Sequence, residues 1–428
     1  PLSTRGLSAG ESSFNADLWR IIMMPEVCVF VRKLIGFFLL GLMALLIWQR
    51  DAILDELRAL RPLPQSAVSM DGASKVVVRY YPTETPVLPL TRAPSPAAAI
   101  ANAATATKLI PTNTPTPAPD NALIRGLILQ RQTFNNCGPA TLSMQLAAFG
   151  SRDNQYRVAQ TLRPDKDDRN VSLDEMAAYA RSKGLNARVV QGGDLELLRG
   201  LIAKGLPVII ETWFIPQPND EMGHYRLAMG FTRAKTTDEF VFFDSYEGEN
   251  VRMPAQEIDA LWKAFNRAML VVWSPTQDGD VRALLGERMN DAPMRQRALA
   301  VARAEAAANP KDKFAWFNVG TNLLALGDGA GAAQAYDRAR AIGLPWRMMW
   351  YQFGPYAAYY AAQRYDDVIQ LANETLKSVN NLEESYYWRG VAHAAKDDAE
   401  AARADLQKAI SLNANYEAAR NALEKLAR

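Results

Sequence analysis

The interpretation of this chain starts from residues 132–146, which read QTFNNCGPATLSMQL. Cys137 stands where the pattern predicts the start of an amphipathic helix. The thiolate is the reactive form of cysteine, and the amino terminus of a helix stabilises negative charge. The side-chain amide of Gln132 can donate to an oxyanion beside the backbone N–H of Cys137. The stretch therefore predicts a thiol nucleophile with an oxyanion hole.

A thiol nucleophile needs a general base and a group that orients the base. The chain of 428 residues contains two histidines, His224 and His393. His224 begins a predicted strand, and Asp244 ends a second apolar strand, so pairing of the two strands would bring these side chains together. His393 falls inside a predicted repeat helix at a position that is normally aromatic, which favours a structural role.

Several segments together resemble papain-like cysteine peptidase family 39, named for peptidases that cut double-glycine leaders from bacteriocin precursors. They are residues 132–142, the GHY element at 223–225, and the DSY element at 244–246 followed by Trp262, Asn266 and Val271. The resemblance covers roughly residues 125–275. It implies a papain-like α+β fold with Cys137 as nucleophile, His224 as general base, Asp244 as orienting residue and Gln132 as oxyanion donor.

The sequence departs from the leader peptidases in three respects. Asn136 precedes the cysteine, where those enzymes usually carry aspartate. Their glutamine lies six residues before the cysteine, whereas Gln132 lies five before it and Gln130 seven, so Gln130 is an alternative donor. The chain shows no transporter segment and no nucleotide-binding motif. The natural substrate therefore does not follow from the resemblance.

Hydrophobic periodicity predicts helices first and then a largely antiparallel sheet in a domain over residues 123–276. We expect strands at 124–129, 185–190, 206–213, 224–231, 240–244 and 268–273. Helices are expected at 137–149, 172–183, 195–204 and 254–265. The helix at 172–183 should begin with a capping box formed by Ser172 and Glu175.

Residues 280–428 are predicted to be all-α. Gly320, Gly354 and Gly390 recur at intervals of 34 and 36 residues, and an aromatic residue lies four positions before each of them. This pattern resembles tetratricopeptide repeats, with a degenerate middle unit at about 347–379 and a half repeat near 294–310. The repeats either bind a protein partner in a concave groove or buttress the catalytic domain.

The segment before the α+β domain predicts a membrane anchor and a stalk. Residues 34–48 carry no charge, which predicts a transmembrane signal anchor at 30–49; a cleaved signal peptide and a buried helix are the alternatives. Residues 1–29 are of doubtful structure. The juxtamembrane and Pro/Thr/Ala-rich residues 50–122 form a linker. We expect the catalytic and repeat domains to lie outside the cytoplasm.

Composition excludes several other classes of function. The formal net charge is +2 with mixed signs, so no nucleic-acid partner is expected. Two histidines and two scattered cysteines do not make a usual zinc site, and no phosphate-binding glycine loop occurs, so no metal or cofactor is expected. The sequence predicts a membrane-anchored cysteine peptidase acting on peptides or proteins. The alternatives are a non-catalytic binding scaffold and a thiol-dependent acyl or amide transferase.

Overall fold

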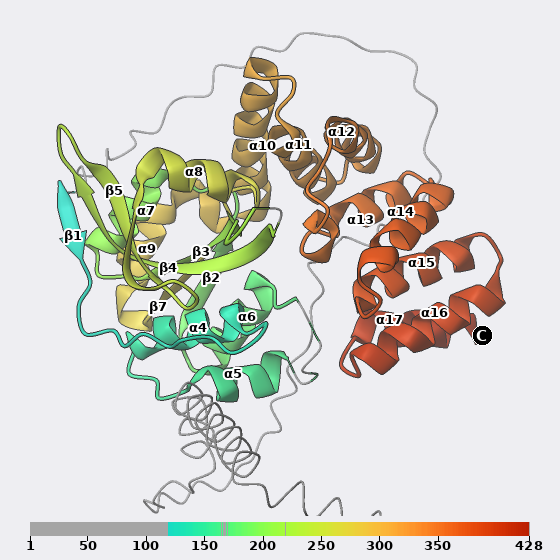
Figure 1. Cartoon of the computed structure of the whole chain (residues 1–428), viewed down its shortest axis with the longest axis horizontal. Helices are drawn as coiled ribbons and strands as arrows, with labels where there is room; N and C mark the ends of the chain where they lie inside the picture. The colour runs from blue at the N-terminus through green and yellow to red at the C-terminus, as the bar shows by residue number, and fades with distance from the viewer. Residues whose placement is uncertain (1–118, 164, 166–167, 169, 219, 428) are drawn as a thin grey trace, which may run out of the picture. The chain divides into compact units, whose positions relative to one another are not determined.

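The computed structural model describes residues 119–163, 165, 168, 170–218 and 220–427. The expected anchor at 30–49, Cys28 and nearly all of the expected linker lie outside these residues. Among the described helices, none combines the length and the apolar character needed to cross a membrane. The described chain contains a sheet domain followed by an all-helical region (Figure 1).

An antiparallel sheet forms the centre of the first domain. Its order is β2-β7-β3-β4-β5-β6, and β1 pairs with the far half of β4 beyond a bulge at 228–230. The long β4 thus pairs with β3 near its start and with β1 near its end. The strands are β1 (Asn121–Leu123), β2 (Asn186–Val190), β3 (Val208–Phe214), β4 (Met222–Arg233), β5 (Asp238–Asp244), β6 (Gly248–Pro254) and β7 (Met269–Trp273).

Helices cover both faces of this sheet, as Figure 1 shows. Alternate side chains of β3 point to opposite faces. Ile209 packs into the core beneath α4 (Cys137–Ala147), α5 (Gln155–Leu162) and α6 (Leu173–Ser182). Val208 and Ile210 pack into the core beneath α7 (Leu195–Ala203), α8 (Ala255–Lys263) and α9 (Asp278–Leu285). Because both faces are covered, every residue of β3 is buried, and the strand begins with three consecutive apolar residues.

The sequence-based prediction was wrong at the start of this domain. Residues 124–129 are not a strand; the pairing with β4 involves β1 and ends at Ile124, whose N–H donates to the Met229 carbonyl at 2.8 Å. Gly126 then turns the chain with a φ of 83°. The helix α5 and the strand β6 were not expected. The capping box of Ser172 and Glu175 is present at the start of α6, as predicted.

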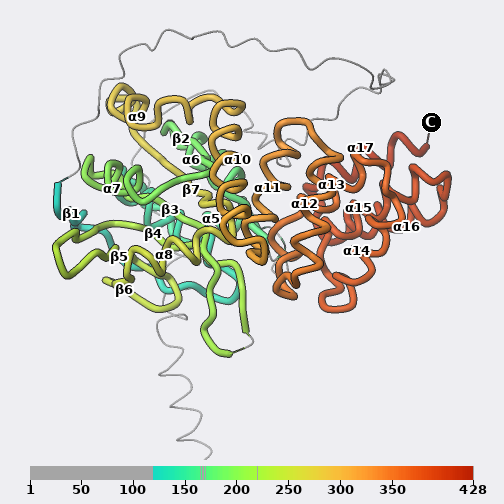
Figure 2. The backbone as a smooth tube through the Cα atoms, turned by 90° about the horizontal axis from the view of Figure 1, so that it is seen from above, coloured from blue at the N-terminus to red at the C-terminus, as the bar shows by residue number. Residues whose placement is uncertain are grey.

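Paired helices follow one another through the C-terminal region (Figure 2). A Cβ atom at Gly320 would lie 2.9 Å from the Tyr336 ring, and one at Gly390 would lie 3.0 Å from Leu406. Glycine therefore permits the close approach of helices within two of the pairs. The helices are α10 (Asp291–Ala308), α11 (Lys313–Ala325), α12 (Gly329–Ile342), α13 (Gly354–Ala361), α14 (Tyr365–Ser378), α15 (Glu383–Ala395), α16 (Ala399–Leu412) and α17 (Glu417–Leu426).

The middle pair, α13 and α14, is the degenerate unit. Trp350 lies in a 3₁₀ turn, η3 (Met348–Trp350), whereas its counterpart Trp316 lies inside α11. Residues 351–353 consequently stand outside α13. Tyr351 packs against Trp213 and Phe265 of the sheet domain, with ring centroids 6.4 Å apart in each pair. The irregular unit therefore brings a residue of the helical region to the sheet.

The sheet domain and the first helix pairs share one hydrophobic core, which includes Trp213, Phe265, Phe317 and Tyr336. Two buried asparagines bridge the boundary: each amide of Asn266 and Asn322 donates to the other's carbonyl oxygen at 3.0 Å. Asn266 also adopts a left-handed backbone conformation with a φ of 53°. Asn266 is one of the residues that carry the family resemblance. Its hydrogen bonds and its backbone conformation at this boundary give a structural reason for an asparagine there.

Candidate active site

Cys137 is the first residue of α4, and its side chain is partly exposed. The next residue must be small, because a Cβ at Gly138 would lie 3.3 Å from Val171 and 3.5 Å from the Tyr225 ring. The rest of α4 is buried from Gly138 to Leu146. The helix is therefore fixed by the core, and its amino terminus presents the sulfur at the surface of the domain.

The loop that leads into Cys137 is held by one buried side chain, Gln155. Its Oε1 accepts from the Thr133 N–H at 2.9 Å and from Asn136 Nδ2 at 2.8 Å. Its Nε2 donates to the Arg131 carbonyl at 2.6 Å. Sequence reasoning missed Gln155, because nothing in the pattern around it links α5 to a loop twenty residues earlier. The buried amide fixes the backbone on which the proposed nucleophile stands.

His224 and Asp244 lie side by side on β4 and β5. Their strands pair so that Asp244 lies opposite Arg226, two residues after His224 and on the same face. The distance from His224 Nε2 to Asp244 Oδ1 is 2.8 Å, and both side chains are buried. With Nε2 bonded to Asp244, the second ring nitrogen, Nδ1, is left for another partner. This is the adjacency expected from the sequence.

The electrostatics of His224 link the three side chains. Burial by itself would lower the pKa of His224, but the interactions with Asp244 and then Cys137 outweigh burial and raise that pKa to about 9. A charged imidazole at neutral pH stabilises a neighbouring thiolate, which is the reactive form of cysteine. The structure therefore shows a hydrogen-bonded pair of His224 and Asp244, and Cys137 lies close enough to influence the pKa of His224.

Asp244 is completely buried and remains ionised because several donors surround it. Its Oδ1 also accepts from the backbone N–H groups of Tyr246 at 2.8 Å and Glu247 at 3.0 Å. Arg226 Nε lies 2.9 Å from Oδ2. Burial raises the pKa of Asp244, but the interactions with His224, Arg226 and the backbone outweigh burial and hold this pKa far below its usual range.

An aromatic ring covers the imidazole. Phe214, the last residue of β3, stacks on His224 with ring centroids 4.8 Å apart and an interplanar angle of 30°. The guanidinium of Arg226 lies 5.0 Å from the centroid of the Phe214 ring. Phe214 and Arg226 were both missed by sequence reasoning. The only available signal was the alternation along β4, which places Arg226 on the same face as His224.

The two candidate oxyanion donors occupy different environments. Gln132 Oε1 accepts from the Ser245 hydroxyl at 2.8 Å, and its backbone N–H donates to the Ser245 carbonyl at 2.9 Å. With its oxygen held by Ser245, the amide of Gln132 keeps its Nε2 as a donor. Gln130 Oε1 instead accepts from the backbone N–H of Gln155 at 2.9 Å. The Gln130 side chain therefore accepts from a backbone N–H at the start of α5. The geometry favours Gln132 as the oxyanion donor.

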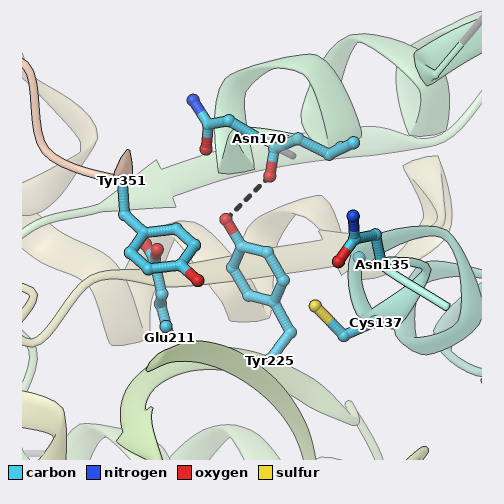
Figure 3. A pocket seen from close by; sticks show the side chains of 9 residues that line it. Asn135, Cys137, Asn170, Glu211, Tyr225 and Tyr351 are labelled. Carbon is cyan, nitrogen blue, oxygen red and sulfur yellow. Dashed lines mark hydrogen bonds between the residues drawn. The ribbon is translucent and has the colours of Figure 1, made fainter. Parts of the chain in front are cut away.

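A narrow pocket opens beside Cys137 (Figure 3). The labelled residues in Figure 3 show its composition: Glu211 and Tyr225 come from the sheet, Asn135 from the loop before Cys137, and Tyr351 from the helical region. The Tyr225 hydroxyl donates to the Val171 carbonyl at 2.8 Å. Burial, and then the charge of Cys137, raise the pKa of Glu211 to about 8. Sequence reasoning identified neither Glu211 nor Tyr351.

His393 lies apart from this site. It belongs to α15, and its Nδ1 is 3.3 Å from the carboxylate of Asp398, the residue that caps the next helix. Among the described residues, no group of three or more histidine, cysteine or carboxylate side chains is placed to hold a metal ion.

Comparison with known proteins agrees with the resemblance seen in the sequence. The model of the Peptidase_C39 like family matches residues 125–270. This match confirms the resemblance for the segment that contains Cys137 and His224. A search of curated proteins returned no match.

A search of solved structures found matches that each cover about a third of the chain. The peptidase domain of Streptococcus ComA, a bi-functional ABC transporter, is 14% identical with a TM-score of 0.28, over 35% of this chain and 98% of that one. A double glycine motif protease from an AMS/PCAT transporter, in complex with its leader peptide, is 19% identical with a TM-score of 0.26, over 36% and 98%. MamA from Desulfovibrio magneticus RS-1 is 16% identical with a TM-score of 0.26, over 31% and 84%.

Proposed function

We propose that this protein is a cysteine peptidase that hydrolyses peptide bonds through Cys137, His224 and Asp244. The observation that carries the proposal is the position of His224, which is hydrogen-bonded to buried Asp244 and lies near enough to Cys137 for the two side chains to interact electrostatically. This arrangement matches the requirement of a nucleophile, a base and an orienting carboxylate. The match of residues 125–270 to a peptidase-like family supports the same reaction class.

The proposed reaction begins when the Cys137 thiolate attacks the carbonyl carbon of a peptide bond. The oxyanion that forms accepts hydrogen bonds from the Cys137 backbone N–H and the Gln132 amide. The His224 imidazolium then gives its proton to the leaving amine, and the C–N bond breaks to leave a thioester. His224, now neutral, takes a proton from water, which attacks the thioester and releases a carboxylic acid and the thiolate.

We assign the helical region primarily to support of the catalytic domain. It shares a core with the sheet domain and supplies Tyr351 to the pocket beside Cys137. Arg347 strengthens this contact through an ion pair with Asp220 at 2.7 Å. A protein partner for the concave surface of the repeats stays a prediction. Membrane anchoring through residues 30–49, with both domains outside the cytoplasm, is likewise proposed from the sequence.

The test combines labelling with a search for products. An alkylating reagent should label Cys137 of the full chain at neutral pH, and His224→Ala should slow this labelling strongly. Newly formed peptide ends should appear in cells that carry the wild type and be absent with Cys137→Ala. Fast labelling without new peptide ends would leave a reactive thiol but overturn the peptidase assignment. Equal labelling rates in the wild type and in His224→Ala would contradict the proposed pairing of Cys137 with His224.

A further inference from the structure

The pocket beside Cys137 has an acidic lining. None of the nine described residues that line it is lysine, arginine or histidine, whereas Glu211 supplies a carboxyl group and Cys137 a thiol. Glu211 is nine-tenths buried on β3 and lies opposite Tyr225 of β4 in the strand register. Its carboxyl group forms no ion pair with any residue in the described part of the chain. The pocket therefore holds an acid that lacks a cationic partner.

Further acidic groups lie around the pocket. Burial first, and then the nearby charges of Glu211, Cys137, Glu175 and Asp174, raise the pKa of Tyr225 well above its usual value. Asn170, which lines the pocket, donates to the carboxyl group of Glu384 at 3.3 Å, and burial raises the pKa of Glu384 well above its usual value. The positive charge of His224 pairs with Asp244 and Cys137, and His224 is not among the lining residues. A cation that enters would therefore meet acidic groups that it can stabilise in their ionised form, and no positive charge among the lining residues.

Charge and shape together select the group that fits. Burying a carboxylate without a partner is costly, so Glu211 stays protonated while the pocket is empty, in line with its pKa of about 8. A cation that enters would stabilise the ionised form. Tyr225 and Tyr351 line the same pocket as Glu211 (Figure 3), and aromatic rings attract cations to their faces. A compact ammonium group suits such a narrow site.

We propose that this pocket binds a primary ammonium group of the substrate next to the bond that Cys137 attacks, with Glu211 as its counter-ion. The inference rests on the proposed peptidase function and assigns a substrate class to it. The ammonium group can belong to a lysine-type side chain or to a free amino terminus, since both offer the same charge and the same three donors. Tyr351 of the helical region is then a specificity-determining residue.

The first test measures the pocket without requiring peptide cleavage. In a Cys28→Ser background, the full chain is labelled with aminoethyl methanethiosulfonate, which is cationic, and with neutral ethyl methanethiosulfonate. The cationic reagent should react with Cys137 at least about tenfold faster relative to free thiol, and Glu211→Gln should abolish this preference. Glutamine has the size of glutamic acid, so the fold should be kept. Glu249→Gln, which removes an exposed acid, is the matched control and should change nothing.

The second test uses a mixture of synthetic peptides whose members differ at one position between lysine, ornithine and norleucine, each with a free or an acetylated amino terminus. Products are quantified by mass spectrometry. Cleavage should favour peptides with an ammonium group by about tenfold. Loss of the preference on acetylation would assign the amino terminus, and loss with norleucine would assign the side chain. Tyr351→Leu should weaken the preference, whereas Tyr351→Phe should keep it.

The outcomes separate the two proposals. If both reagents label Cys137 of the wild type at the same rate relative to free thiol, the proposal of an ammonium pocket is overturned, whether or not peptides are cut. A preference that survives in Glu211→Gln would do the same. A cationic preference together with no cleavage of any peptide would keep the pocket and overturn the peptidase function.

Discussion

Arg226 lies against Asp244 in the interior of the sheet domain, with 2.9 Å between Arg226 Nε and Asp244 Oδ2. Because His224 occupies the other carboxylate oxygen, Asp244 is held from two sides. Arg226 also donates to the Thr212 hydroxyl at 2.6 Å and to the Glu247 carboxylate at 3.0 Å. Arg226 is therefore a positioning residue that fixes the carboxylate which orients His224.

Arg226→Gln should destabilise the protein and impair turnover. Removal of one partner from a buried ion pair leaves the other charge uncompensated and costs about 3–5 kcal/mol. Chemical denaturation measures this loss. Since Arg226 acts through Asp244, kcat should fall while KM changes little, and Arg226→Lys should recover part of kcat. Arg252→Gln, which removes an exposed arginine paired with Glu239, is the control. Equal stability of the two variants would contradict the positioning role.

The pH dependence should report on His224. Its pKa in the folded state is raised to about 9 from an ordinary value of 6.5, so the folded protein holds this proton more tightly than the unfolded chain. The resulting stabilisation is fully present below pH 6.5 and is lost as the pH rises through 9. Activity that needs the imidazolium should fall over the same upper range. Profiles of kcat/KM and of unfolding free energy between pH 6 and 10 measure both effects.

Asp244→Asn supplies the comparison for this profile. Without the carboxylate the pKa of His224 should drop, and the alkaline fall of activity should move to lower pH. Glu211→Gln is the second comparison, because the pKa of Glu211 is about 8 and its titration overlaps the same range. An Asp244→Asn profile that superimposes on the wild type would show that Asp244 does not govern His224.

Replacement of the oxyanion donor should affect turnover and leave the fold intact. Gln132→Ala should lower kcat by about 10²–10³, the usual effect of losing one oxyanion-hole donor, with little change in melting temperature. Ser245→Ala should have a smaller effect, because the Ser245 hydroxyl only holds Gln132 Oε1. Gln130→Ala should chiefly lower stability through loss of its bond to Gln155. A larger drop in kcat for Gln130→Ala than for Gln132→Ala would reverse the assignment.

Gln155→Leu should disorganise the loop before Cys137. Leucine has a similar volume but leaves the Thr133 N–H, the Asn136 amide and the Arg131 carbonyl without their partner. Each buried polar group left unsatisfied costs about 1–3 kcal/mol. Labelling of Cys137 should slow, and thermal unfolding should shift downward. Gln277→Leu, which removes a capping glutamine on η1 (Pro275–Gln277) far along the chain, controls for loss of a glutamine. Unchanged labelling in Gln155→Leu would exclude a role in positioning the thiol.

Local pattern was enough for much of the fold. The apolar run over β3 predicted a buried strand, the Ser172–Glu175 pair predicted the start of α6, and the recurring glycines predicted close helix pairs. Local pattern failed at residues 124–129, where apolar residues lead away from the sheet after Gly126 turns the chain. In that segment tertiary contacts, and not hydrophobicity, decide which residues pair with β4.

The amino-acid sequence by itself determined the chemical elements of the site: a cysteine at a helix start, a histidine at the start of one strand and an aspartate at the end of the next. These follow from short-range periodicity, which adjacent antiparallel strands convert into proximity. Only the tertiary structure decided that Gln155 holds the loop, that Arg226 lies against Asp244, and that Tyr351 reaches the pocket with Glu211. Those contacts join residues distant in the chain, and their geometry depends on how whole layers pack together.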